Sequence, residues 1–191
     1  PGLLREASER GDVFAMRAFR GWRGNMAWLI VGRPTAARSH LQAAMPPNPD
    51  GHVTVQRYYE LISGLQIDLY EGEIAAAAAR LAEAMPIFIR GKLLRLQTMR
   101  IELGWVRGRI LLATATDASH APAIAAVARA LRKEKVPWGT AFALALEASV
   151  QRLRGDTAGA VRAIDLAIEA FGACDMALMV TVARWCRAAL T

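Results

Sequence analysis

Three histidines and two cysteines are the residues of this chain best suited to act as bases, nucleophiles or metal ligands. His40, His52 and His120 fall on separate predicted elements, and none has a partner at the spacing of a His-x-x-x-His, Glu-x-x-His or Cys-His zinc motif. Cys174 and Cys186 would be roughly 18 Å apart in one helix, too far for a disulfide. We therefore expect no metal and no cofactor, and interpret both thiols as small buried residues in a reducing compartment.

Motifs for phosphate binding or nucleophilic catalysis are also missing from the sequence. Gly91-Lys92 lacks the first glycine and the following Ser or Thr of a phosphate loop, and none of the five serines has a Gly-x-Ser-x-Gly context. Paired carboxylates can perform acid–base chemistry, but the acids here flank a glycine turn, so we favour a solvated surface for them. These acids are Glu60, Asp68, Glu71 and Glu73. The chain itself is predicted not to be an enzyme.

Apolar residues recur every three or four positions along nearly the whole chain, and no stretch shows the alternation of a half-buried strand. The chain has 191 residues and is 54% hydrophobic, which is enough for a full core. Pro34 and Pro122 suit first helical turns, and Asp156 and Asp175 suit N-caps. Separated by Gly and Pro, ten helices are predicted: 2–10, 12–32, 34–45, 53–71, 73–89, 92–116, 121–135, 138–155, 157–171 and 175–190.

An internal repeat is the most informative feature of the sequence. Residues 32–46 align without a gap with residues 72–86, and both copies begin with Gly and end with Ala-Met-Pro. A weaker copy follows Gly155. Each copy reads as a helix pair joined by a tight glycine turn, which is typical of tetratricopeptide-like or HEAT-like repeats. The predicted fold is all-α, a right-handed α-α superhelix of tetratricopeptide-like helix pairs that forms one helical-repeat domain over 1–191.

The positive charge of the chain is concentrated in one segment. The formal net charge is +7, and residues 87–135 carry 10 cations and 3 anions. Such a cluster can mark a nucleic-acid surface. Because the composition is rich in Arg throughout and residues 46–86 offer an acidic complement, we favour an ordinary solvated or inter-helix charge pattern.

The residues predicted to bind a partner are cations of this basic segment and aromatic residues near helix starts. Arginine can pair bidentately with carboxylate or phosphate, and aromatic side chains can anchor a peptide. Trp28 and Trp105 lie on apolar stripes and are predicted to be core, and at most one of the two adjacent tyrosines is expected to be buried. The predicted binding residues are Arg95, Arg100, Arg107, Arg109, Tyr58, Tyr59 and Trp138.

The last predicted helix, 175–190, has an apolar face that no further helix of this sequence covers, so we predict a homodimer through it. That face consists of Met176, Met179, Val180, Ala183 and Trp185. No apolar run approaches the roughly 18 residues of a membrane span, and no secretory signal is readable, so we expect a cytoplasmic protein without a membrane partner. The chain lacks an initial Met and ends inside a helical pattern, so we expect a C-terminal fragment of a larger multidomain protein.

Six segments stand in a characteristic order along the chain: Tyr59-Glu-Leu-Ile-Ser-Gly-Leu-Gln-Ile-Asp-Leu-Tyr-Glu-Gly72, Ala84-Met-Pro86, Leu93-Leu-Arg-Leu-Gln-Thr-Met-Arg-Ile-Glu102, Val136-Pro-Trp138, Arg154-Gly-Asp156 and Cys174-Asp-Met-Ala-Leu178. Together they resemble the C-terminal helical region of large myxobacterial-type bacterial serine/threonine protein kinases of the eukaryotic type. The Gly-rich loop, His-Arg-Asp loop and Asp-Phe-Gly of a kinase domain are not in this sequence, so no catalytic residue carries over.

The resemblance implies a non-catalytic protein-interaction or regulatory module of a multidomain signalling protein. ATP binding and kinase activity would belong to the parent protein, and the partner would be a protein or peptide, including other domains of the parent kinase. The alternative is a nucleic-acid-associated helical domain of an ATPase-type transcription regulator, which would bind duplex DNA in a strongly salt-dependent way.

Overall fold

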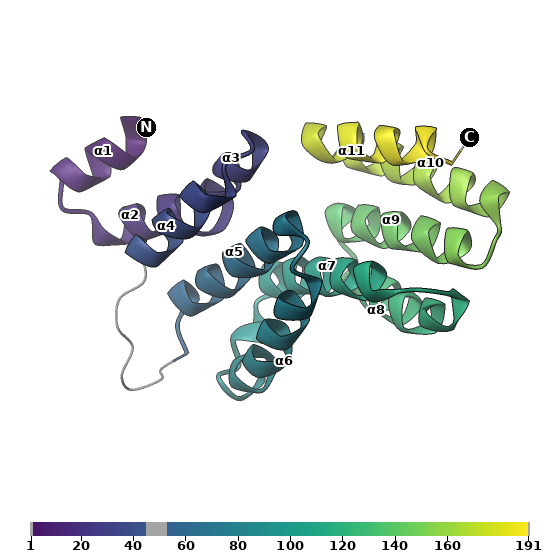
Figure 1. Ribbon diagram of the computed structural model, residues 1–191, viewed down its shortest axis with the longest axis horizontal. Helices are drawn as coiled ribbons and strands as arrows, with labels where there is room; N and C mark the ends of the chain where they lie inside the picture. Colours follow the sequence, from purple (N-terminus) through teal and green to yellow (C-terminus); the bar gives the residue numbers. More distant parts are fainter. Residues whose placement is uncertain (1, 45–52, 191) are drawn as a thin grey trace. The chain divides into compact units, whose positions relative to one another are not determined.

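The computed structural model describes residues 2–44 and 53–190, and helices are the only regular secondary structure in these ranges (Figure 1). The all-α class predicted from the apolar period is therefore confirmed. The chain divides into two compact units, Pro1–Leu96 and Gln97–Thr191.

The first unit is built around α5. Its described elements are α1 (Gly2–Glu9), α2 (Val13–Arg20), α3 (Trp22–Ile30), α4 (Pro34–Ala44), α5 (Val55–Glu71), α6 (Ile74–Arg90) and the 3-10 turn η1 (Leu93–Arg95). Helix α5 packs against α3, α4 and α6, while α1 packs against α2. Residue 45 of the expected helix 34–45 and residues 45–46 of the repeat copy 32–46 lie outside the described residues.

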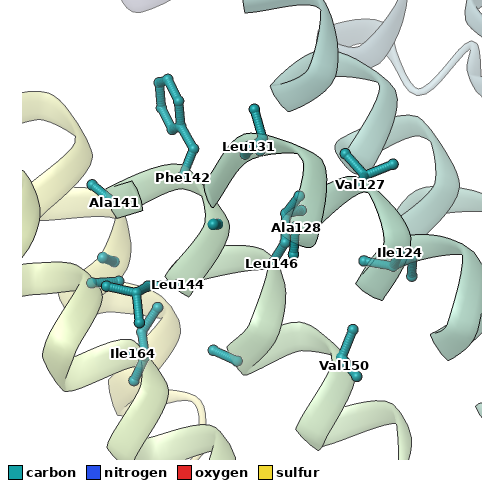
Figure 2. Packing of buried hydrophobic residues seen from close by; sticks show 14 of the residues in the cluster. Ile124, Val127, Ala128, Leu131, Ala141, Phe142, Leu144, Leu146, Val150 and Ile164 are labelled. Carbon is teal, nitrogen blue, oxygen red and sulfur yellow. The ribbon is translucent and has the colours of Figure 1, made fainter. Parts of the chain in front are cut away.

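The second unit is built around α9. Its elements are α7 (Gln97–Thr114), the 3-10 turn η2 (Ala118–His120), α8 (Ala121–Lys133), α9 (Pro137–Leu153), α10 (Thr157–Ala173) and α11 (Ala177–Ala188). Helix α9 packs against α7, α8 and α10, and α11 packs against α10. In Figure 2, Leu146 and Val150 of α9 lie among the apolar side chains of α8, and Leu144 lies beside Ile164 of α10. Burial of this continuous apolar cluster is what holds the second unit together.

Three helix pairs share the same glycine junction. Gly32, Gly72 and Gly155 have φ of +72°, +79° and +79°, a left-handed conformation that glycine adopts without strain. The helix after each glycine buries an alanine five residues later, namely Ala37, Ala77 and Ala160, and each of these has 0% of its surface exposed. Because the side chain at that point is small, the second helix of each pair can pack closely against its neighbours.

Two predicted helices are interrupted in the structure. The expected helix 12–32 is wrong because the chain is extended at Gly21, where the Trp22 amide donates a hydrogen bond of 2.7 Å to Ser63 Oγ of α5. The expected helix 92–116 is wrong because Lys92 has a φ of +56° and Leu96 is extended, so that α7 begins at Gln97.

Of the two predicted N-caps, one is present in the structure and the other is not. Asp156 is confirmed as an N-cap, since its carboxylate accepts a hydrogen bond of 2.7 Å from the Gly159 amide. Asp175 is not an N-cap, because it has a φ of +55° and Met176 takes the capping position without a side-chain bond. Pro34 begins α4, and Pro122 lies in the first turn of α8, as expected.

Helices α7 and α9 lie in close contact at Gly108 of α7. A Cβ at Gly108 would lie 2.5 Å from Cδ1 of Leu146, which is buried, so Gly108→Ala forces the core to shift. We expect a loss of about 1–3 kcal/mol in the free energy of unfolding, measured by urea denaturation. Gly172→Ala is the matched control, because it is also in a helix of this unit and its Cβ would meet nothing within 4 Å.

The control is expected to be neutral or to stabilise the chain by roughly 0.5–1 kcal/mol, since alanine loses less backbone entropy than glycine. Equal effects of the two substitutions would contradict the close contact between α7 and α9.

Candidate functional site

The second unit has an open groove of about 380 Å³ lined by α7, α9, α10 and α11. Helix α9 lies between α7 and α11 in Figure 1 and supplies Ala145, Ala148, Ser149 and Arg152 to the lining. These residues recur every three or four positions, so they share one face of the helix. Three of the four are small, and their size leaves the groove open.

Helix α7 forms one side of the groove through Trp105, Arg109 and Leu112. The Trp105 ring stacks on Phe142 of α9, with centroids 4.7 Å apart and an angle of 11°. Phe142 in turn packs edge-on against the buried Phe171, with centroids 5.6 Å apart. The orientation of Trp105 in the groove is therefore set by the core.

Arg109 is a half-buried cation in the groove. Its guanidinium carbon lies 5.9 Å from the centre of the Trp105 ring. Burial lowers the pKa of Arg109 from its usual value. A guanidinium stays protonated at neutral pH, so Arg109 brings a positive charge to an apolar surface.

Helix α11 forms the other side and carries an uncovered apolar stripe. Leu178, Val182 and Trp185 are spaced by four and three residues, and 50%, 47% and 74% of their surfaces are exposed. Val182 and Trp185 also line the groove, next to the exposed Cys186. The helix therefore presents one continuous apolar strip beside the groove.

The apolar face predicted to be uncovered on this helix packs mostly against the core, and a different apolar face is exposed. Ala183 is buried, and three more of the five predicted residues pack against the core cluster: Met176, Met179 and Val180. Trp185 is the one predicted residue that is exposed. The sequence has two apolar faces here, and the face with the smaller Ala183 packs inward.

Of the seven predicted binding residues, Arg109 lines the groove and the other six do not. Arg107 is exposed on α7, and Arg95 is exposed in η1 of the first unit. Trp138 lies in the first turn of α9 and packs edge-on against Phe142, with ring centroids 6.0 Å apart. These residues therefore do not form one site.

Arg100 is held by an ion pair within the second unit. Its Nε and Nη2 donate to the two carboxylate oxygens of Glu134, at 2.7 and 2.6 Å. The hydrogen bond to Glu134 raises the pKa of Arg100, and the reciprocal bond lowers the pKa of Glu134. The pair connects α7 to the end of α8.

The two predicted tyrosines lie in different surroundings on α5. Tyr58 is buried and packs edge-on against Phe88, with centroids 6.1 Å apart, whereas Tyr59 is half-buried and stacks on Trp22 at 4.9 Å. The expectation that at most one of them is buried is confirmed. The two tryptophans predicted as core, Trp28 and Trp105, are half-buried and pack against buried clusters of their own units.

Asp68 is a buried carboxylate of the first unit. The solvated surface predicted for it is wrong, since 2% of its side chain is exposed. Arg38 donates to one oxygen at 3.0 Å and Arg80 to the other at 2.8 Å, and Arg38 also pairs with Glu71. Burial opposes the charge of Arg38, but the bonds to Glu71 and Asp68 outweigh it and raise the pKa of Arg38. With a guanidinium on each oxygen, Asp68 links α4, α5 and α6 and has a structural role.

The described histidines and cysteines do not form a cluster that could hold a metal ion. In residues 2–44 and 53–190, no three His, Cys, Asp or Glu side chains lie close enough together to hold a metal ion. His40 stacks on Trp28, His120 lies 3.6 Å from Asp117, and His52 is outside the described residues. Both cysteines are free thiols, but the prediction that they are buried is wrong, because Cys174 is half-buried and Cys186 is exposed.

Comparison of the chain with protein-family models, curated proteins and solved structures gives no match. Within the described part of the chain, no helix combines the length and the apolar character that crossing a membrane requires. The geometry of the groove is therefore the basis for a functional assignment.

The groove itself was missed by sequence reasoning, although two signals for it are present. Leu178, Val182 and Trp185 have helical spacing, and the small residues Ala145, Ala148 and Ser149 share a face of α9. Either pattern occurs in buried helix contacts as well, so only the packing shows that these residues line an open groove.

Substitution of Asp68 tests the buried ion pairs of the first unit. Asp68→Asn leaves Arg38 and Arg80 without their shared anion, and we expect the free energy of unfolding to fall by about 2–3 kcal/mol, because both arginines keep access to water. Glu83→Gln on exposed α6 surface is the control and is expected to change stability by less than about 0.5 kcal/mol. Similar urea midpoints for the two variants would contradict the structural role of Asp68.

Acid titration tests the Arg100–Glu134 pair. The pKa of Glu134 is lower in the folded chain, so the pair stabilises the fold above the unfolded value of about 4.3 and loses this effect as the pH falls through the folded pKa. The stability difference between the wild type and Glu134→Gln should be constant from pH 7 to 5 and should shrink below about pH 4.5. Urea denaturation at each pH measures it, and a difference independent of pH would refute the assignment.

Proposed function

We propose that this chain is a non-catalytic protein-interaction module that binds a segment of a partner protein in the groove of the second unit. The observation that carries the proposal is the apolar groove itself, with Trp185 exposed over 74% of its surface at its edge. Large contiguous apolar patches on a protein surface mark interaction sites, and tryptophan is enriched among residues that dominate binding energy.

The groove suits a protein segment better than a small molecule. Small-ligand sites enclose most of the ligand surface and place several polar groups around it. Here one side is the exposed stripe of α11, and the polar side chains of the lining are those of Arg109, Arg152 and Ser149. The Ser149 hydroxyl donates to the Ala145 carbonyl at 3.2 Å, so its hydrogen is already used within α9.

A tetratricopeptide-like right-handed superhelix is part of the same proposal. The three glycine junctions with equivalent buried alanines support repeated helix pairs. The groove is lined mainly by α7, α9 and α11, which would be the first helices of successive pairs. In helical-repeat proteins, successive repeats create such concave binding surfaces.

A regulatory role in a signalling protein extends this proposal. The resemblance to kinase C-terminal regions supports a partner that belongs to the parent kinase or to its pathway. The free thiols Cys174 and Cys186 support a reducing compartment such as the cytoplasm.

The nucleic-acid alternative has less support from the charge arrangement. In the basic segment, Arg100 is paired with Glu134, and Arg132 donates to both carboxylate oxygens of Glu147 at 2.6 and 2.7 Å. In the first unit, Arg38 and Arg80 are paired with Asp68. Cations alternate with acids within each unit, whereas a nucleic-acid site needs a run of cations directed at phosphates.

An affinity capture with groove variants tests the function. The immobilised chain and its Trp185→Ala variant are incubated with a lysate of the source organism, with and without nuclease and at two salt concentrations. We expect the wild type to retain a small set of proteins regardless of nuclease, and Trp185→Ala to lose at least about 90% of them, because an interface anchor is worth roughly tenfold or more in affinity.

Leu166→Ala is the matched control, since Leu166 is also exposed in the second unit, over 52% of its surface, but does not line the groove. It should retain the same proteins as the wild type. Capture that disappears with nuclease, or that is equally strong for Trp185→Ala, would contradict the proposal.

A further inference from the structure

We infer that the groove of the second unit recognises an amphipathic α-helix whose apolar face is bordered by Asp and Glu. This inference rests on the proposed function and specifies the chemistry of the partner. Three features carry it: the stripe of α11, the charge of the lining and the scarcity of hydrogen-bonding groups in the groove.

The stripe on α11 has the geometry of a helix-binding surface. Leu178, Val182 and Trp185 follow the spacing at which one helix presents anchors to another, and Cys186 and Ala189 extend the apolar surface into the groove. From Leu178 to Ala189 the stripe is roughly 16 Å long at 1.5 Å per residue, which matches about three turns of a partner helix.

The groove offers few partners for an exposed peptide backbone. Its lining is mostly alkyl, aromatic and alanine side chains, and the Ser149 hydroxyl is already bonded within α9. An extended peptide in this groove would bury amide and carbonyl groups without hydrogen bonds, which is costly. A helix satisfies those groups internally and presents only side chains, so the lining favours a helical occupant.

The charge of the lining favours an acidic occupant. Arg109 and Arg152 line the groove from α7 and α9, and no Asp or Glu does so. Helix α11 contains no acidic residue, and its Arg187 is already paired with Asp165 of α10. Carboxylates at the borders of the partner's apolar face would pair with the guanidinium groups of Arg109 and Arg152.

The same charges disfavour a second copy of this chain as the occupant. Two α11 helices packed through their exposed stripes would bring no carboxylate to Arg109 or Arg152, because α11 contains no acidic residue. Cations that meet no opposite charge across an interface gain no electrostatic complementarity. The homodimer predicted from the sequence is therefore less well supported than an acidic partner.

Two synthetic helical peptides test the inference directly. Both have 14 residues, capped ends and the same leucine face; one carries Glu along both borders of that face and the other carries Lys. Binding of each labelled peptide to the 191-residue chain is followed by fluorescence anisotropy. We expect the Glu peptide to bind at least about tenfold more tightly than the Lys peptide at low salt, and the difference to shrink as salt rises.

A pair of arginine variants locates the charge effect. Arg152→Glu reverses a charge in the groove lining, whereas Arg154→Glu makes the same change two residues away, outside the lining. The first should weaken binding of the Glu peptide about fivefold to tenfold, and the second less than about twofold. Trp185→Ala should weaken binding of the peptide by about tenfold or more, and circular dichroism checks that each variant is folded.

Each other outcome overturns the inference, and some leave the proposed function in place. Equal binding of the Glu and Lys peptides, lost in Trp185→Ala, would show an apolar interaction site without acidic preference. Failure of both peptides would reject the acidic helix, while the lysate capture would still decide the interaction function. Concentration-dependent dimerisation that Trp185→Ala abolishes would identify a second copy as the occupant.

Discussion

Close contact between α9 and three neighbouring helices is the constraint on which the second unit depends. Gly108 of α7 leaves space for Leu146, and Ala160 and Ala167 of α10 are fully buried at the adjoining contact. Interiors pack densely, so helices meet closely only where one side supplies small residues. On the face of α9 that lines the groove, small residues have the opposite effect, because Ala145, Ala148 and Ser149 are too short to fill the space between α7 and α11. Small residues on α9 and its neighbours therefore account both for the close packing of the core and for the open groove.

The first unit contains a buried carboxylate in addition to its apolar core. The second unit has a continuous apolar cluster that runs through α8, α9 and α10. In the first unit, α4, α5 and α6 are also connected by the buried Asp68 and its two arginines. An ion pair of this kind has directional geometry, so it fixes how the three helices face one another. Asp68 thus has a structural role in the first unit, and the proposed interaction site lies on the second.

The sequence predicted the helices and the glycine junctions because both depend on local patterns. It failed where a distant residue decides the local backbone, as at Gly21, where Ser63 receives the Trp22 amide. It also failed for Asp68, since burial there depends on arginines contributed by two other helices. For the candidate site, Arg109 was found from charge alone. The orientation of α11 was not predicted correctly, because the helix has two apolar faces and only packing against α10 determines which of them is buried.

Trp105 stacks on Phe142, and Phe142 packs edge-on against the buried Phe171, which has an evolutionary consequence. A mutation that reshapes the α7 side of the groove also disturbs the core, so stability limits which residues natural selection can accept there. The stripe on α11 has no such restriction, because its side chains face away from the core. Related proteins could therefore diverge in partner choice by changing α11 while the α7 side stays the same, which would separate the evolution of specificity from the maintenance of the fold.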